Sequence, residues 1–312
     1  MTSKSSIQTV LGERKLAELQ GPDSIALVHE HLSCDLSQSF GPEYVLQDLP
    51  LVTSEVEIAS AKNVSLIIDV GNSGHGGDPE FLREVARKSG IAVVASTGHY
   101  REGFFPPEVA SLSIAELAEA MVADIEKGLA GTDIKAGAIA EIGFTEAEAT
   151  ELEEKVFLAA ARAQAETGAP LLTHTAQGVG WAQQLDLLTR GGADLERVVI
   201  GHMDCLDDNS AHVAVIQAGA WLGFDRINSL RYQTDEVRVD RLIDLFDAGL
   251  EDRILLSTDT AMVTRLTANG GAGYAAPVTV LVPLLIERNV SEEIIRKLIY
   301  VNAWNYLGAV AS

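Results

Sequence analysis

Residues 136–143 read Ala-Gly-Ala-Ile-Ala-Glu-Ile-Gly, a run of small and aliphatic side chains interrupted by one carboxylate, Glu141. Such a run, without polar alternation, predicts a β-strand that is buried on both faces, as in a parallel sheet. Seven further and mostly aliphatic runs occur along the chain, at 25–29, 64–70, 91–96, 170–175, 198–203, 220–225 and 254–259. The sequence therefore predicts eight buried strands.

Between these runs, apolar residues recur at three- and four-residue spacing, which predicts amphipathic helices. The predicted helices span 80–88, 114–128, 152–167, 181–189, 210–218 and 239–248, with two more at 278–287 and 292–300. Strands that alternate with helices indicate an α/β fold, a single (β/α)8 TIM barrel, with one domain over residues 1–312. An open doubly wound sheet is the alternative, but no G-x-G-x-x-G loop follows the first run. We expect residues 1–24 to form a lid over the N-terminal face of the barrel.

The composition of the chain limits its partners. Its 312 residues carry a formal net charge of −22, and so acidic a surface repels nucleic acid and anionic lipid. The sequence has no apolar run of about 18 residues that could cross a membrane, and no apolar signal core follows Met1. The two cysteines, Cys34 and Cys205, do not resemble a disulfide framework. We expect a reduced, cytoplasmic protein that acts on a small molecule.

Histidines gather where the predicted strands end. His29 and His31 lie in V-H-E-H-L after the first run, and because alternate residues of a strand point to the same side, one metal ion can contact both. His174 ends the fifth run and His202 ends the sixth. Each alone could be a satisfied core histidine, but all four occupy the same layer of the predicted barrel. The segments after the strands, which are longest at 32–53, 99–113, 226–236 and 260–277, build the active site in this fold.

Two carboxylates join this layer. Glu141 lies in the fourth run and Asp259 ends the eighth, and carboxylates are rare in apolar strands unless they are paired or bound to a metal. The alternative is that each caps a helix or pairs with a lysine. Four imidazoles and two carboxylates suit zinc, manganese, cobalt or iron, and they exceed what one tetrahedral ion uses.

We therefore predict two divalent ions per chain, of which zinc is the favoured metal. One buried ion would be held by His29, His31 and Asp259. The outer ion would be held by His174 and His202, with Glu141 as the bridge. Water between two such ions loses a proton near neutral pH and becomes a nucleophile.

Other candidates are weaker on the sequence alone. His75 lies in a Gly-rich stretch, 71–78, and we expect an exposed loop histidine rather than a substrate contact. His99 precedes Tyr100 and could line the pocket. Asp69 ends the second run and could orient a ligand histidine. Lys135 precedes the fourth run and is interpreted as a charge on the rim.

The order and spacing of several motifs resemble the phosphotriesterase family of the amidohydrolase superfamily. The shared motifs are V-H-E-H-L, I-K-A-G-A-I-A-E-I-G, L-E-E-K-V-F-L-A-A-A, T-H-T, I-G-H-M-D and L-S-T-D, and the resemblance extends from residues 9–12 to residues 301–304. The branch of phosphotriesterase homology and phosphotriesterase-related proteins is the most similar, since it has a glutamate as the bridging ligand, as Glu141 would be here. The resemblance implies a dinuclear metal centre and allows a homodimer.

The chain departs from the true phosphotriesterases around the predicted pocket. Cys205 and Arg226 stand where those enzymes have an aspartate and a histidine, and Tyr100 stands where they have a tryptophan. Tyrosine in T-G-x-Y and arginine in F-D-R are similar to the lactonases of the family. These residues, together with His99, are the expected substrate contacts.

The resemblance and the ligand set together predict a metal-dependent hydrolase. A metal-bridging hydroxide would attack a carbonyl carbon, most readily that of a lactone or other carboxylic ester. Asp259 would take up the proton, Tyr100 would hydrogen-bond the carbonyl or ring oxygen, and Arg226 would position the leaving group. The alternatives are an amidase for a small N-acyl compound, a promiscuous phosphotriesterase activity, and a metal-loaded binding protein without turnover.

Overall fold

A computed structural model describes residues 6–308. Eight parallel strands follow the predicted runs, and the third consists of two pieces, β7 and β8, on either side of Ala95. The strands are β3 (Ile25–Glu30), β6 (Val64–Asp69), β7 (Ala92–Val94) with β8 (Ser96–Thr97), β9 (Ala138–Gly143), β10 (Leu171–His174), β11 (Val198–Ile200), β12 (Trp221–Phe224) and β13 (Ile254–Leu256). Adjacent strands pair in sequence order, so the predicted TIM barrel is confirmed.

The barrel closes between its first and last strands through the residues that follow β13. Ser257 Oγ accepts hydrogen bonds from the backbone N–H groups of Val28 and His29, both at 3.1 Å. The N–H of Asp259 donates to the carbonyl oxygen of His29 at 3.2 Å. The closure therefore fixes the backbone of two predicted ligand residues relative to each other.

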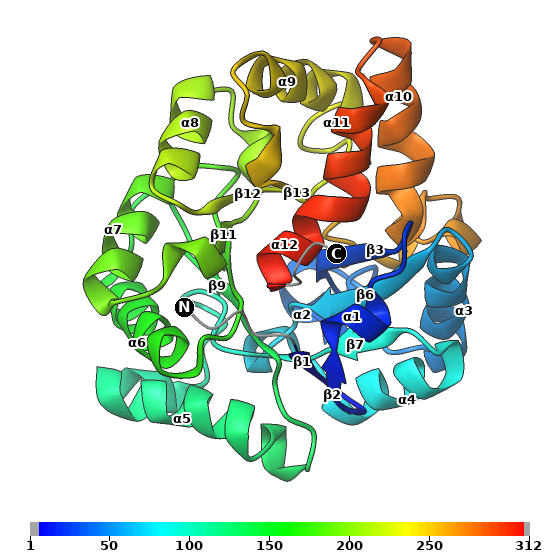
Figure 1. Cartoon of the computed structure of the whole chain (residues 1–312). Helices are drawn as coiled ribbons and strands as arrows, with labels where there is room; N and C mark the ends of the chain where they lie inside the picture. The colour runs from blue at the N-terminus through cyan, green and yellow to red at the C-terminus, as the bar shows by residue number, and fades with distance from the viewer. Residues whose placement is uncertain (1–5, 309–312) are drawn as a thin grey trace.

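Helices surround the strands (Figure 1). They are α3 (Leu49–Ser60), α4 (Pro79–Ser89), α5 (Ile114–Glu126), α6 (Glu151–Thr167), α7 (Trp181–Gly191), α8 (Asn209–Gln217), α9 (Asp235–Asp247), α10 (Val282–Glu287) and α11 (Glu292–Arg296). A π-helical turn, Pro277–Leu281, precedes α10, and another, Lys297–Val301, follows α11. No helix among residues 6–308 is long and apolar enough to cross a membrane.

Helix α3 corrects the sequence prediction, which placed residues 32–53 in a loop. Asp48 caps the helix by accepting from the N–H of Leu51 at 3.0 Å, and Val52, Val56 and Ala59 face the core. The remainder of the segment contains β4 (Cys34–Asp35), α2 (Ser37–Phe40) and β5 (Val45–Leu46). The predicted loop 226–236 likewise ends early, because α9 begins at Asp235.

One end of the barrel is filled with apolar side chains. The hairpin of β1 (Ser6–Thr9) and β2 (Gly12–Lys15), followed by α1 (Leu16–Leu19), lies across it together with α12 (Asn302–Leu307). Ile7, Leu16 and Trp304 belong to the same buried cluster as the side chains inside the barrel. A Cβ at Gly137 would lie 2.1 Å from the carbonyl oxygen of Gln8, so the hairpin packs this closely only against a glycine.

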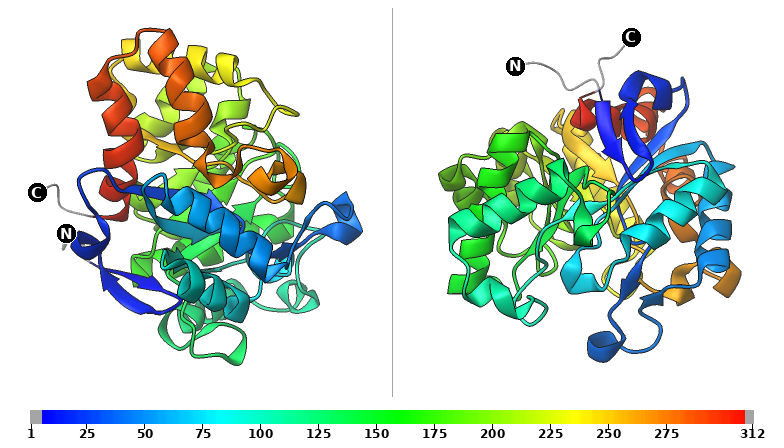
Figure 2. Two further views of the ribbon diagram at one scale, coloured as in Figure 1. Left: turned by 90° about the vertical axis from the view of Figure 1, so that its right-hand side faces the viewer. Right: turned by 90° about the horizontal axis from the view of Figure 1, so that it is seen from below.

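The opposite end carries the long loops. Figure 2 shows the dark blue hairpin at the filled end and the blue segment around α2 projecting at the other. Glu153 of α6 ties two of these loops together, since its Oε1 accepts from the N–H groups of Glu102 and Thr145 at 3.2 and 2.8 Å. Its Oε2 accepts from the N–H of Thr150, the N-cap of α6, at 3.0 Å. Because the loops after the strands build the active site in this fold, we expect the site at this open end.

Candidate metal centre

The six predicted ligand residues converge at the open end of the barrel. His29 lies in β3 and His31 directly after it, Glu141 in β9, and His174 at the end of β10. His202 and Asp259 follow β11 and β13. Because the strands are parallel, their carboxyl ends present these side chains to one small volume.

Glu141 occupies the middle of the cluster. Its Oε1 lies 2.7 Å from His174 Nδ1, 3.1 Å from His202 Nε2 and 3.3 Å from His29 Nε2. Its Oε2 lies 3.2 Å from His75 Nε2 and 3.7 Å from His31 Nε2. One carboxylate therefore contacts imidazoles on both of its oxygens, as a bridging ligand would.

Asp259 lies at the edge of the cluster. Its Oδ1 is 3.3 Å from His31 Nε2 and 3.8 Å from His29 Nε2, and its Oδ2 accepts from Arg226 Nε at 3.1 Å. Asp259 and His202 have φ angles of 48° and 59°, in the left-handed region. That conformation costs roughly 1–3 kcal/mol for a residue other than glycine, and it is typical of functional sites.

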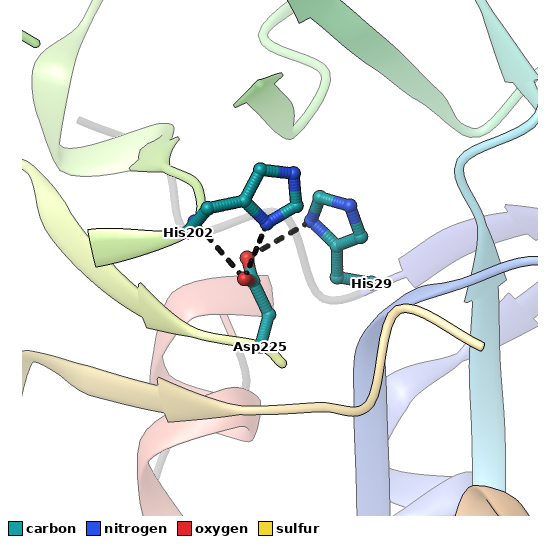
Figure 3. Close-up of side chains that lie close together, drawn as sticks. All are labelled: His29, His202 and Asp225. Atoms are coloured by element: carbon teal, nitrogen blue, oxygen red, sulfur yellow. Dashed lines mark hydrogen bonds and ion pairs between the residues drawn. The ribbon is translucent and has the colours of Figure 1, made fainter. Parts of the chain in front are cut away.

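Asp225 is a site residue that the sequence interpretation missed. It accepts from the backbone N–H of His202 at 2.9 Å, and its Oδ1 lies 2.7 Å from His202 Nδ1 (Figure 3). Its Oδ2 lies 3.1 Å from His29 Nδ1. A carboxylate can only accept, so the hydrogen bond at His202 places a proton on its Nδ1 and leaves Nε2 of the neutral ring with a lone pair. The available signal was position, because Asp225 ends the seventh run in the layer of the other ligands.

The positions of the ring protons indicate whether these residues can bind a metal ion. The Nε2 of neutral His202 faces Glu141 Oε1 at 3.1 Å, so two electron pairs meet there without a proton between them. The Nε2 of His29 lies 3.3 Å from the same oxygen. His202 Nε2 also lies 2.8 Å from His174 Nδ1. A cation relieves this repulsion, and imidazole with carboxylate is a set that suits transition metals. The residues therefore fit a metal centre.

Glu141, Asp259 and His174 are in the forms that bind a metal. Burial acts to raise the pKa of Glu141, but the surrounding imidazoles, His174 foremost, hold it well below its ordinary value. Burial lowers the pKa of His174 to about 3, so this imidazole is neutral. Burial also acts to raise the pKa of Asp259, and His31, His202 and Arg226 lower it. Ionised carboxylates and a neutral imidazole are the metal-binding forms.

A small pocket of about 80 Å³ opens over the cluster. Beyond the ligand residues, its lining consists of Leu36, Phe40, Tyr44, His75, Tyr100, Arg226, Arg231, Tyr232 and Ala261. The Tyr100 hydroxyl lies 3.3 Å from His174 Nε2, and the Arg226 guanidinium lies 4.1 Å above the Tyr232 ring. Arg231 contacts the hydroxyl of Tyr44, which joins the loops after β12 and β3.

The structure corrects three predictions about nearby residues. His75 is buried, with 1% exposure, and contacts Glu141, so it is not an exposed loop histidine. His99 lies against Phe105 and lines a separate cavity of about 260 Å³ between the barrel and helices α4 and α5. Asp69 binds backbone instead of a histidine, since its Oδ2 accepts from the N–H of Leu32 at 2.5 Å.

Cys205 and Lys135 lie away from the pocket lining. The Sγ of Cys205 is 3.9 Å from Arg226 Nη1, so it supports the arginine. Lys135 lines a cavity beside the N-terminal hairpin, at the far end of the barrel, in keeping with a rim charge.

Comparison with known proteins identifies the family. The family model of the phosphotriesterases matches residues 5–307. The chain belongs to the phosphotriesterase family. It is 41% identical over 272 residues to the phosphotriesterase homology protein of Escherichia coli strain K12, covering 87% of this chain and 93% of that protein. It is 29% identical over 273 residues to the mouse N-acetyltaurine hydrolase, covering 84% and 78% of the two chains.

Solved structures of the family agree in fold. A crystal structure of the Escherichia coli phosphotriesterase homology protein, with phosphate in its active site, has a TM-score of 0.89 at 39% identity and covers 92% of this chain and 99% of that chain. A lactonase from Listeria monocytogenes also has a TM-score of 0.89, at 26% identity, and covers 99% and 100%. The chain is therefore a hydrolase of a metal-dependent family, with a cluster positioned for metal.

Proposed function

We propose that this phosphotriesterase-family hydrolase cleaves a lactone or other carboxylic ester. The observation that carries the proposal is the pocket over the cluster, where a hydroxyl and a guanidinium lie beside the metal ligands. A flat carbonyl substrate fits so narrow a space better than a phosphotriester, which carries three substituents on a tetrahedral centre. The likeness to a lactonase supports this choice.

The centre would hold two divalent ions, with zinc as the favoured metal and manganese, cobalt or iron as alternatives. His29, His31 and Asp259 would hold one, and His174 and His202 the other, with Glu141 between them. When bound, such ions polarise a carbonyl group and lower the pKa of water.

The protein's own side chains would position the substrate and move the proton. Asp259 is held ionised and fixed by Arg226, so it can accept a proton and return it to the leaving oxygen. Burial raises the pKa of Tyr100 above its ordinary value, so its hydroxyl keeps its proton and can donate to the carbonyl or ring oxygen. Arg226 is held by Asp259 and the Tyr232 ring, and it suits a polar or anionic substituent.

A second candidate is hydrolysis of a small N-acyl amide. Two arginines, Arg226 and Arg231, line the pocket, and the mouse relative is an N-acetyltaurine hydrolase, whose named substrate carries a sulfonate. The same residues would serve, but the leaving amine requires a stronger proton donor than an alkoxide does. Phosphotriester hydrolysis would be a side activity, and a binding role without turnover is the weakest alternative for a family of hydrolases.

A substrate panel tests the proposal. The zinc-loaded enzyme is assayed with lactones, carboxylic esters, N-acyl amides and paraoxon. We expect kcat/KM for the best lactone or ester to exceed that for paraoxon by at least about a hundredfold, or about 2.7 kcal/mol. Amides that surpass every lactone and ester would instead support the second candidate, and comparable efficiency on paraoxon would refute both.

Tyr100→Phe tests the role of the hydroxyl. If the hydroxyl acts in the transition state, kcat should fall more than KM rises. Tyr300→Phe, a half-buried tyrosine outside the pocket, is the matched control. An unchanged kcat in Tyr100→Phe would remove Tyr100 from the reaction.

A further inference from the structure

His75 contacts the cluster from a loop rather than from a strand end. It closes a one-turn helix, Ser73–His75, that follows β6. Its Nε2 lies 3.2 Å from Glu141 Oε2, and its ring lies 5.1 Å from the His31 ring and 4.3 Å from the Tyr100 ring. The ring therefore fills the space between a predicted ligand and the pocket wall.

The neighbouring Asn72 can hold a proton on one nitrogen of His75. The Asn72 amide is fixed, because its Nδ2 donates to the carbonyl oxygen of Ala140 at 2.9 Å and its Oδ1 accepts from the N–H of Gly74 at 2.9 Å. The same Oδ1 lies 3.1 Å from His75 Nδ1. An amide oxygen only accepts, so a hydrogen bond at this contact carries its proton on Nδ1.

The opposite tautomer suits a site without a cation. There Nδ1 accepts from the backbone N–H of Asn72 at 3.4 Å, and Nε2–H donates to Glu141 Oε2 at 3.2 Å. In the tautomer with Nδ1–H, the proton faces the Asn72 amide oxygen at 3.1 Å, and Nε2 carries a lone pair. Asn72 therefore offers His75 the tautomer that a metal ligand requires.

In the tautomer with Nδ1–H, the Nε2 of His75 faces a carboxylate as that of His202 does. Two acceptors then lie 3.2 Å apart in a buried space, since His75 and Glu141 are 1% and 2% exposed. Ligand atoms of His31, His75 and Glu141 all lie within 4.8 Å of one another. A cation between them removes the repulsion.

We propose that His75 is a ligand of the metal ion held between His31 and Glu141 Oε2. The inference rests on the metal centre of the proposed function. It adds a ligand from the loop after β6 to the ligands at the strand ends. That ion would be held more tightly than by His29, His31 and Asp259 with the bridge alone. It would also have one position fewer for water or substrate.

His75→Gln tests the assignment. A glutamine retains an N–H donor that could orient Glu141 but is a poor ligand for zinc. Zinc affinity is measured by competition with a chromogenic chelator, and metal content by elemental analysis. We expect one of two zinc equivalents to bind more than about a hundredfold more weakly, beyond the roughly 10–100-fold effect of losing a group that only orients a ligand.

His99→Gln is the matched control, because His99 is also a loop histidine but lies in the separate cavity. Its zinc affinity should equal that of the wild type. If His75→Gln also binds both equivalents within about tenfold of the wild type, His75 orients Glu141 and is not a ligand.

A second measurement does not depend on the variant. A crystal structure of the zinc-loaded wild type should place His75 Nε2 about 2.0–2.1 Å from an ion. A nearest ion beyond about 3 Å would overturn the inference while leaving the metal centre intact. Wild-type protein that binds no divalent ion would overturn both this inference and the proposed metal centre.

Discussion

At the scale of single residues, Asp225 shows how the barrel prepares its ligands. It contacts His29 from β3 and His202 from the turn after β11, so one carboxylate orients imidazoles from two strands. Gly223 is required beside it, because a Cβ there would lie 2.4 Å from Asp225 Oδ2. The segments V-I-G-H and W-L-G-F-D therefore contain glycines that leave room for the Asp225 carboxylate, as well as the predicted ligand His202.

Asp225→Asn should weaken metal binding. The amide cannot accept from both Nδ1 atoms, so one histidine loses its orienting partner, and affinity should fall by roughly 10–100-fold. Chelator competition measures the change, with exposed Asp247→Asn as the control. A zinc affinity in Asp225→Asn equal to that of the control would mean that packing alone orients the two histidines.

Sequence periodicity allowed the residues at predicted strand ends to be grouped into a site. Residues whose positions depend on tertiary contacts were missed. His29, His31, Glu141, His174, His202 and Asp259 could be grouped because each lies at a predicted strand end. His75 could not, since its position depends on a one-turn helix and on the Asn72 amide, and neither has a periodic signal. Asp225 was within reach of the same reasoning as the ligands but was taken only as the end of a strand.

At the scale of elements, the N-terminus of α6 links the fold to the site. Thr150 and Glu153 form a capping box, and Glu153 in addition holds the loops at Glu102 and Thr145. Glu102 is two residues from Tyr100, so the helix cap helps to fix the pocket wall. The capping pattern is visible in the sequence, but its tertiary contacts are not.

Glu153→Ala should destabilise the protein by about 3 kcal/mol, because it leaves several half-buried N–H groups without their acceptor. The midpoint of urea unfolding should fall, whereas Glu151→Ala, an exposed residue in the same turn, should leave it nearly unchanged. A loss below about 1 kcal/mol for Glu153→Ala would show that water replaces the carboxylate.

Strands were easier to predict than the helix that follows the first of them. Six runs contain their strands, and the runs 25–29 and 91–96 end one residue before β3 and β8 do, because buried parallel strands need near-continuous apolar sequence. Helix α3 was missed because it follows a long irregular segment that includes α2, β4 and β5. Within that segment, the N-cap residue Asp48 was not distinguished from a loop residue. Helix α3 also buries a glutamate, Glu55, so its apolar face is less regular.

At the scale of the whole molecule, folding and metal binding should be coupled. Buried imidazole nitrogens and carboxylate oxygens that repel one another without a cation favour the metal-loaded state. Removing metal with a chelator should therefore lower Tm, and zinc at a hundred times its Kd should restore about 2.7 kcal/mol, or roughly 5 °C. Scanning calorimetry of both forms measures the difference.

Glu141→Gln is the control for this effect, since it removes the carboxylate between the histidines but keeps its volume. Added zinc should raise the Tm of this variant by much less than that of the wild type. An equal rise in both proteins would indicate that zinc stabilises the fold elsewhere, and an unchanged wild-type Tm would argue against coupling.

The filled end of the barrel also determines how the enzyme can be handled. Ser6 and Gly308, the first and last described residues, belong to the end covered by the hairpin and α12, and the pocket opens at the other. An affinity tag, a fused protein or a resin joined at Ser6 or Gly308 would therefore be attached behind the barrel. Enzyme immobilised at either residue should keep its pocket facing the solution, so a flow reactor could use either point of attachment.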